Sequence, residues 1–312
     1  MAKIRCVEDL VQNFARTRPI RGGSLILTVY GDAIAPRGGA VWLGSLIALL
    51  APLGLNQRLV RTSVFRLSKD GWLTGAHVGR RSFYRISELS RRRFEQAFRR
   101  VYGKPHVEWD GEWCIVMLSQ LESTARDALR KELAWLGFGT IAPGVMAHPM
   151  TDQNSLLTTL QELGVQEGVI VMRAHGERFS SEQALKELVQ QCWNLEQVAQ
   201  YYQRFLERFR PVWSALKGVN DLEPEPCFLI RTLLIHDYRR MLLRDPQLPD
   251  ELLPADWAGA AARRLCRNLY RLIYEPAEQH LSQMLQTADG PLPEVAPKFY
   301  DRFGGLREIR VS

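Results

Sequence analysis

Residues 56–87 change from a helical to a strand pattern within a few positions, and this change narrows the possible folds of the N-terminal region more than any other feature. Asn56 is a plausible N-cap for a helix predicted over 57–69, and Gly71 ends that helix. Two short strands rich in β-branched and aromatic residues follow, within GWLTGAHV and RSFYRIS, with GRR between them. The segment therefore predicts a helix followed directly by a two-stranded ribbon.

Two apolar, helix-compatible stretches precede this segment. They are SLILTVYGDAIA (24–35) and VWLGSLIALLAPL (41–53), and the PRGG between them is a turn signal. Three helices followed by a two-stranded ribbon is the order of elements in a winged helix-turn-helix, a DNA-binding fold. SELSRRRFEQAFRRVYG (87–103) is predicted to form a basic helix that leaves this region, with Ser87 and Ser90 as candidate caps.

Charge is divided unevenly along the 312-residue chain, whose net charge is +7. Residues 1–104 hold 19 Lys and Arg against six Asp and Glu, a balance of +13, whereas the remainder holds 22 and 28, a balance of −6. A basic N-terminal region on a mildly acidic body predicts binding to a polyanion, and double-stranded DNA is the leading candidate.

The predicted 57–69 helix separates into two faces at about 100° per residue. Val60, Ser63, Val64 and Leu67 share the apolar face. The opposite face suits the major groove, where Arg grips guanine and Thr reaches base edges, and arginines between the strands suit phosphates or the minor groove. The predicted DNA contacts are Gln57, Arg58, Arg61, Thr62, Arg66, Lys69, Arg80 and Arg81.

The alternative for this helix is a solvated surface whose cations keep the chain soluble. Surface helices usually mix both charge signs, and residues 56–69 contain no acid at all, which favours DNA binding. Phe65 falls among the cations, where an aromatic side chain is unusual. Either it touches a thymine methyl, or the helix is rotated and Phe65 is buried.

Two further regions follow, so that domains are expected at 1–104, 105–180 and 181–312. In the second, WCIVML (113–118) predicts a strand buried on both faces, and alternating helices and strands over about 70 residues predict a ferredoxin-like α/β domain. The third region has long helical patterns and is expected to be mostly helical. The fold class is thus α+β and multidomain.

Several classes of protein are disfavoured by composition. No apolar run approaches the roughly 18 residues of a membrane span, and the charged start does not resemble a secretory signal. The five cysteines are scattered without a CxxC pair, which favours a reducing cytoplasm over disulfides or a zinc finger. The six histidines are equally dispersed without a metal-ligand spacing, so no metal site is expected. The chain is also expected to use no cofactor.

Long strings spread over nearly the whole chain closely resemble the PaaX-type repressors of phenylacetate degradation. They are YGDAIAPRGGAVWLGSLIALLAPLGLNQRLVRTSVFRLSKDGWL, GRRSFYRIS, WDGEWCIVML, WLGFGTIAPGVMAHP, HDYRRMLLRDPQLPDELLPADWAG and YDRFGGL. The resemblance implies a transcriptional repressor that phenylacetyl-CoA releases from its operator. It also implies a winged-helix N-terminal domain, a central ferredoxin-like domain similar to Cas2 nucleases, and a family-specific helical C-terminal domain. By division of labour among the three, the C-terminal domain is expected to sense the effector.

The resemblance to Cas2 nucleases raises the alternative of a metal-dependent nuclease. Those enzymes place an Asp at the end of the first strand to hold the metal, and this chain has Ser119 and Gln120 there. Glu122 is the first acid, so the expected carboxylate ligand is missing. We therefore expect no enzymatic activity, and a homodimer formed by this domain and the 87–103 helix.

Effector contacts are less clearly marked. Arg239 and Arg240, in the polar cluster His236–Arg240, could pair with the phosphates of CoA or with the acidic DPQLPDELLP segment that follows. Arg263 and Arg264 are candidates for the same role, and Arg267 competes with them. Cys192, Trp193 and Trp257 are expected to pack in the core.

Overall fold

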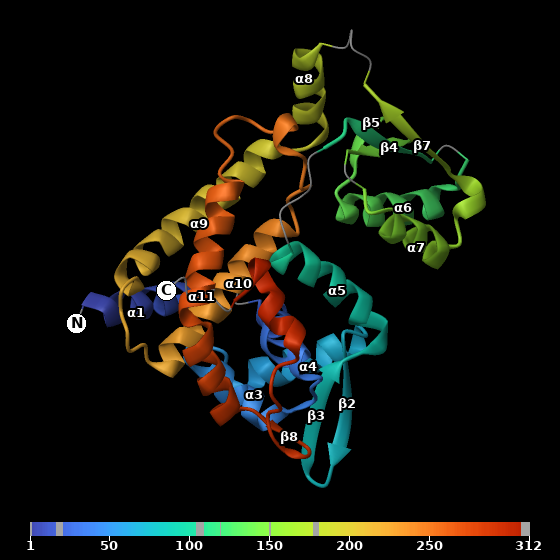
Figure 1. The fold of residues 1–312 in the computed structure, drawn as a ribbon. Helices are drawn as coiled ribbons and strands as arrows, with labels where there is room; N and C mark the ends of the chain where they lie inside the picture. The colour runs from blue at the N-terminus through green and yellow to red at the C-terminus, as the bar shows by residue number, and fades with distance from the viewer. Residues whose placement is uncertain are drawn as a thin grey trace. The chain divides into compact units, whose positions relative to one another are not determined.

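The computed structural model describes residues 2–16, 21–103, 109–118, 120–149, 151–176 and 181–306, and the chain divides into two compact units. Unit 1 comprises residues 1–104, 204–240 and 260–312, and unit 2 comprises residues 105–203 and 241–259. The ribbon in Figure 1 shows both, with α-helices in each. Within the described ranges, no helix has the length and apolar character that crossing a bilayer would demand.

In unit 1, the first predicted helical stretch is helical but changes its winding. α2 (Gly22–Val29) passes into a π-helical turn over Tyr30–Ile34 and a 3-10 turn over Ala35–Arg37, which contains Pro36. Gly38 follows with a φ of 70°, a left-handed conformation that ends the helix. The helix expected over 41–53 begins later than predicted.

That later start has a physical reason. Val41 and Trp42 form the short strand β1, which pairs with Tyr84 and Phe83 as the third strand of a sheet. α3 (Leu43–Leu50) begins only after this pairing and ends in a 3-10 turn over Ala51–Leu53. The helical pattern of 41–53 was therefore overridden at its first two residues by sheet pairing with a segment about 40 residues away.

The helix and ribbon predicted from residues 56–87 are confirmed. α4 spans Gln57–Lys69, and the side chain of Asn56 caps it by accepting a hydrogen bond from the Leu59 N–H at 2.8 Å. β2 (Leu73–Val78) and β3 (Arg81–Ile86) pair antiparallel. α5 (Glu88–Tyr102) then begins at the N-cap Ser87, whereas Ser90 is no cap and donates its hydroxyl to the Gly71 carbonyl at 2.9 Å.

The C-terminal part of unit 1 consists of helices and a small hairpin. Its long helices are most of α10 (Pro224–Leu242) and α11 (Gly259–Met284) and the part of α9 (Leu195–Leu216) from residue 204 onward. α1 (Ala2–Arg16) belongs to the same unit. The two-residue strands β8 (Gln286–Thr287) and β9 (Gly290–Pro291) follow, and then a 3-10 segment over Pro297–Gly304. The region expected to be mostly helical thus also contains a small hairpin.

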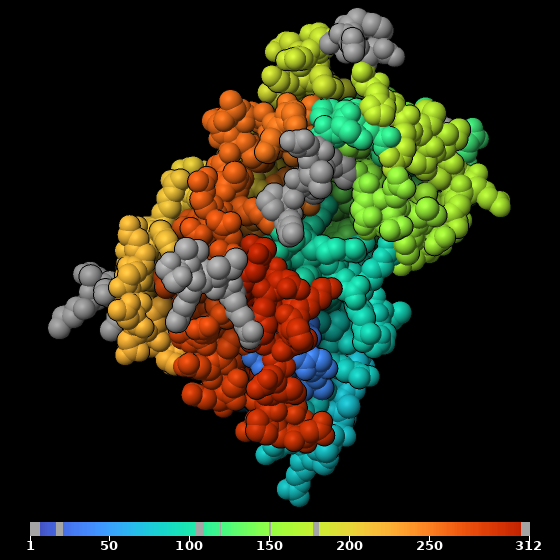
Figure 2. Space-filling view, viewed as in Figure 1, coloured from blue at the N-terminus to red at the C-terminus, as the bar shows by residue number. Residues whose placement is uncertain are grey.

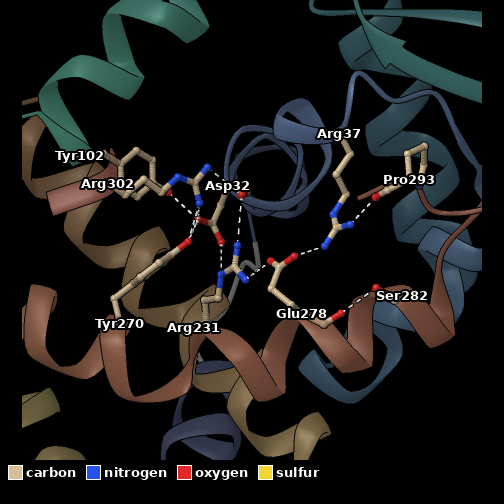
Figure 3. A network of polar contacts seen from close by, with 9 residues as sticks. All are labelled: Asp32, Arg37, Tyr102, Arg231, Tyr270, Glu278, Ser282, Pro293 and Arg302. Carbon is tan, nitrogen blue, oxygen red and sulfur yellow. Dashed lines mark hydrogen bonds and ion pairs between the residues drawn. The ribbon is translucent and has the colours of Figure 1, made fainter. Parts of the chain in front are cut away.

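A buried carboxylate, Asp32, joins the N-terminal and C-terminal segments of unit 1 (Figure 3). Arg231 of α10 donates to it at 2.7 Å, and Arg302 of the last 3-10 segment donates at 2.9 Å. Tyr102 of α5 and Tyr270 of α11 donate their hydroxyls to it at 2.6 and 3.0 Å. Residues 1–104 therefore share their core with helices far along the chain.

Unit 2 contains the predicted ferredoxin-like arrangement. The elements run β4 (Glu112–Met117), α6 (Ser123–Leu136), β5 (Gly139–Ala142), β6 (Val145–His148), α7 (Gln153–Leu163) and β7 (Ile170–His175). The sheet order is β5-β6-β4-β7 with antiparallel neighbours, as in a split βαβ fold. α8 (Glu182–Cys192) belongs to the same unit.

The expectation that the first strand of this sheet is buried on both faces is wrong. In β4, Cys114 and Val116 are buried in the core with α6 and α7, whereas Trp113, Ile115 and Met117 are only partly buried. This alternation occurs because helices of the ferredoxin-like arrangement cover one face of the sheet. A continuous apolar run does not distinguish that case from a strand covered on both sides.

Candidate nucleic-acid interface

α4 is held in unit 1 by one apolar face, as its periodicity predicts. Val60, Ser63, Val64 and Leu67 are buried and pack with α2 and α3. The contact with α2 is close, because a Cβ atom on Gly22 would lie 2.8 Å from the Ser63 hydroxyl oxygen. A side chain at position 22 would require the Ser63 side chain or one of the helices to shift. This docking fixes which side of α4 meets solvent.

The opposite side, which we call the outer face of α4, is exposed along its length. It consists of Gln57, Arg58, Arg61, Thr62, Phe65, Arg66 and Lys69. Phe65 is 68% exposed. Of the two alternatives that the sequence leaves open, the structure therefore supports an exposed Phe65. The chain has no carboxylate between Asp32, which is buried, and Asp70. The outer face therefore offers cations, hydroxyl and amide groups and carries no carboxylate of its own.

The wing, which we define as β2, β3 and the turn between them, holds the two remaining predicted contacts. Gly79 has a φ of 57° in this turn, and Arg80 follows it at the exposed tip. In the space-filling view this tip, in cyan, projects beyond the red residues of the β8–β9 hairpin beside it (Figure 2). Arg80 and Arg81 therefore lie at one end of unit 1, with Arg80 free to approach a phosphate.

Arg81 is less available than Arg80. Its guanidinium lies over the Trp42 ring, 4.5 Å from the ring centroid, and donates to the Gln286 side chain at 3.4 Å. Such a cation–π contact contributes about 0.5–1 kcal/mol at an exposed site. Trp42 and Gln286 thus orient Arg81. The sequence pattern indicates neither partner, because it predicts a helix at Trp42 and no strand near Gln286.

α5 adds a second basic surface close to the wing. Its exposed arginines include Arg91, Arg93 and Arg99, and Arg93 lies over the Trp72 ring at 5.6 Å. Arg91 forms an ion pair with Glu88 of the same helix at 2.7 Å. α4, the wing and α5 together place the predicted basic surface in the first hundred residues of unit 1.

The predicted effector contacts lie on α10 and α11 in unit 1, but they differ in availability. Arg239 donates to the Ser24 carbonyl and hydroxyl, both at 3.1 Å, and to the Thr28 hydroxyl at 3.3 Å. Arg263 donates to the Gly103 carbonyl at the end of α5. Arg240 is half-buried and Arg264 is exposed. Arg239 therefore pairs with α2, not with the acidic segment that follows it in sequence.

His236 and Asp237, which belong to the same polar cluster of α10 as Arg239 and Arg240, contact other helices of unit 1. His236 is buried with its Nδ1 3.1 Å from the Thr28 hydroxyl oxygen. Burial, with help from nearby arginines, lowers the pKa of His236 to about 3, so the ring is neutral at physiological pH. Asp237 forms an ion pair with Arg208. These contacts attach α10 to α2 and α9.

Two described cavities do not coincide with the predicted effector residues. One, of about 890 Å³, lies in unit 1 between α1 and the start of α10, and its lining includes Glu8, Asp221, Glu223 and Glu225. The other, of about 830 Å³, lies in unit 2 beside Trp257. None of Arg239, Arg240, Arg263 and Arg264 lines either cavity. An acidic rim is a poor match for phosphates.

The expected core roles of three residues are partly confirmed. Trp193 is buried and donates its indole N–H to the Gly137 carbonyl at 2.8 Å. Cys192 and Trp257 are partly buried against the same cluster. At the nuclease position, Ser119 lies outside the described residues, and Glu122 is exposed at the start of α6. The described residues contain no group of three or more His, Cys, Asp or Glu able to hold a metal ion.

Comparisons with known proteins show which family the chain resembles. Three family models match: PaaX-like protein over residues 21–90, PaaX protein central Cas2-like domain over 106–186, and PaaX-like protein C-terminal domain over 193–283. Transcriptional repressor PaaX of Escherichia coli (strain K12) is 41% identical over 301 residues, which cover 96% of this chain and 95% of that protein. A solved structure of an uncharacterized protein from Mycobacterium tuberculosis matches with a TM-score of 0.49 and 24% identity, covering 82% of this chain and 97% of that one. This chain belongs to the PaaX-like family of proteins.

Proposed function

We propose that this chain is a transcriptional repressor of phenylacetate catabolic genes that binds double-stranded operator DNA through α4 and the wing, acting as a winged helix-turn-helix. The observation that carries the proposal is the outer face of α4, which is exposed, basic and free of carboxylates. The likeness to a transcriptional repressor over nearly its whole length supports the same conclusion. The chain acts by binding, without catalysis and without a cofactor.

Substitutions of residues that contact bases and of residues that contact phosphates should affect DNA binding differently. We expect Arg58→Ala, Arg61→Ala and Thr62→Ala each to weaken binding to the chain's own promoter DNA by about 1–3 kcal/mol, because each removes a contact to a base edge. Binding to unrelated DNA should change much less. Fluorescence anisotropy titrations with both DNAs at physiological salt measure the two losses.

Arg80→Ala should weaken binding to both DNAs alike and lower the salt dependence by about one counterion, because a phosphate contact carries no sequence information. Arg130→Ala is the matched control, since Arg130 is an exposed arginine on α6 in unit 2. The assignment of this surface to DNA is refuted if the α4 and wing variants all keep the affinity of the wild-type protein and of the control.

We further propose that the repressor binds its operator as a homodimer, with α5 and the ferredoxin-like domain as dimer elements. α5 exposes Leu89 by 87%. In unit 2, the strand register identifies the residues on the sheet face opposite α6 and α7. Every described strand residue on that face is apolar. These are Trp113, Ile115, Met117, Gly139, Ala142, Val145, Ala147, Ile170, Met172 and Ala174.

Trp193 packs against the Gly139 end of this face, whereas its other end is open to solvent. We call Ile115, Met117, Val145, Ile170 and Met172 the open face of the sheet. Ile170 and Met172 are 50% and 41% exposed. An uncharged apolar surface lets two identical copies meet without repulsion. A two-fold dimer presents two copies of α4 and the wing to a pseudo-palindromic operator.

Met172→Lys is therefore expected to convert the protein from dimer to monomer at micromolar concentration, because the contact would bury a charge. Light scattering on the full chain measures the change from twice the 35.7 kDa chain mass to that mass. Leu157→Lys is the matched control, since Leu157 is an apolar residue of α7 that is 54% exposed away from the open face. A monomeric wild-type protein, or a dimer unaffected by Met172→Lys, argues against this interface.

The proposed inducer is phenylacetyl-CoA, bound by the C-terminal helices of unit 1. Arg240 and Arg264 are the proposed phosphate contacts, because Arg239 and Arg263 already have partners within the protein. A guanidinium pairs with a phosphate through two parallel hydrogen bonds, whereas free phenylacetate carries a single charge. The thioester should release the repressor from its operator.

A further inference from the structure

Phe65 has no structural role that explains its presence on α4. Its side chain is 68% exposed, and no aromatic ring or cation stacks on it in the described part of the chain. The large apolar residues Val60, Val64 and Leu67 of the same helix all point into the core. Burying a Phe side chain stabilises a protein by about 1.5–3 kcal/mol, and this position forgoes that gain.

The neighbours of Phe65 restrict what it can contact. On the helix surface it lies next to Arg61 and Thr62, four and three residues before it, and next to Lys69, four residues after it. An apolar protein surface would leave these cations buried without partners, which is costly. A polyanion satisfies the cations, so a partner that contacts the whole surface combines negative charge with an apolar group for Phe65.

DNA offers that combination in the major groove. The C5 methyl group of thymine is the apolar group that a base pair presents there, and Phe is among the side chains that contact it. Resting on the proposed function of α4, we propose that Phe65 is a specificity-determining residue that reads a thymine methyl of the operator. The phosphates and base edges around that thymine pair with the neighbouring cations.

The helix geometry also places this thymine relative to other contacts. Arg58, Arg61, Thr62 and Phe65 follow one another along a single stripe of the outer face. Seven residues separate Arg58 from Phe65, which is about 10 Å along the helix axis at the rise of an α-helix. The thymine read by Phe65 should therefore belong to a different base pair from the base gripped by Arg58.

Replacing thymine with uracil in the operator tests the proposal, because it removes only the methyl group and leaves base pairing intact. Thymines are replaced one at a time in the chain's own operator, and affinities are measured for the wild-type protein and for Phe65→Ala. The wild-type protein should lose roughly three- to tenfold in affinity at one position of each half-site, the loss expected for about one buried methyl group. Phe65→Ala should bind the thymine and uracil operators equally at that position.

Arg58→Ala is the matched control on the same helix face. It should bind the operator more weakly and yet retain the preference for thymine at the position that Phe65 reads. The inference is wrong if no single uracil weakens the wild-type protein, or if Phe65→Ala discriminates thymine from uracil as the wild-type protein does. A wild-type protein that prefers the operator over unrelated DNA but ignores the methyl groups contradicts this inference alone. A wild-type protein without any operator preference contradicts the proposed function itself.

Discussion

Replacing Asp32 with Asn is expected to lower the free energy of unfolding of unit 1 by about 3–5 kcal/mol, a large part of a typical domain's stability. Asp32 accepts hydrogen bonds from two arginines and two tyrosines, and all five side chains are buried. Removing one partner from a buried ionic network leaves the other charges without compensation. The loss of stability therefore comes more from leaving buried arginines without a compensating charge than from the lost Asp32 contacts themselves.

The two arginines depend on Asp32 to different degrees. Arg231 also pairs with Glu278 of α11, so it keeps one carboxylate in the variant. Arg302 has Asp32 as its acidic partner and is otherwise surrounded by aromatic rings, with Tyr102 and Phe299 centred 4.2 and 4.3 Å from its guanidinium carbon. Arg302 should consequently lose its position first, and the last 3-10 segment with it.

Hydrogen exchange on the full chain can measure this effect, because it reports the opening of each unit separately. Protection should fall in α2, α10 and α11 of the Asp32→Asn protein and stay unchanged in the sheet of unit 2. Asp70→Asn is the matched control, since Asp70 is an exposed carboxylate at the end of α4. A loss below about 1 kcal/mol, or one equal to the control, contradicts the central role of Asp32.

The effect of Asp32→Asn should also depend on pH. Burial alone would raise the pKa of the Asp32 carboxyl, but the guanidinium groups of Arg231 and Arg302 outweigh burial and hold this pKa below its ordinary value. A lowered pKa in the folded state means that the stabilisation is fully present above the unfolded pKa of about 3.9. It is lost as the pH falls through the folded value. The difference between variant and wild-type protein should therefore be full at neutral pH and shrink in acid.

Local features of this fold could be predicted from the sequence because each depends on residues close together in the chain. The bounds of α4, its Asn56 cap and its buried face follow from a 3.6-residue period and a capping side chain. The alternation of helices and strands in unit 2 likewise predicts its topology. The outer face of α4 follows by elimination once the buried face is known.

Contacts between distant segments could not be predicted in this way. The partners of Asp32 lie 199 and 270 positions away in Arg231 and Arg302, and no local pattern links them. The short strand β1 has the same cause, because Val41 and Trp42 are recruited by β3 against their helical pattern. Arg239 is a third case, since its pairing with α2 removes it from the predicted effector contacts. Long-range packing decided each of these outcomes.

The contacts between Arg239 and α2 provide a route by which binding of the proposed inducer affects the outer face of α4. α10 carries Arg240 beside Arg239, Arg239 holds Ser24 and Thr28 of α2, and α4 packs on α2. A ligand that shifts α10 would move α2 and hence the outer face of α4. Phenylacetyl-CoA must then bind the DNA-free form more tightly than the DNA-bound form, and by linkage DNA must weaken thioester binding by the same factor.

We expect phenylacetyl-CoA to reduce operator affinity roughly thirty- to a hundredfold, which corresponds to a coupling of about 2–3 kcal/mol and is enough to open a promoter. Operator titrations with phenylacetyl-CoA, free phenylacetate and plain CoA measure the release, and calorimetry measures binding of each to the DNA-free protein. Arg240→Ala and Arg264→Ala should weaken thioester binding and leave operator affinity without effector unchanged, whereas Arg130→Ala should change neither. Equal binding of phenylacetate and the thioester contradicts the phosphate contacts. Thioester binding that leaves operator affinity unchanged contradicts the switch, because a ligand with equal affinity for both states shifts no equilibrium.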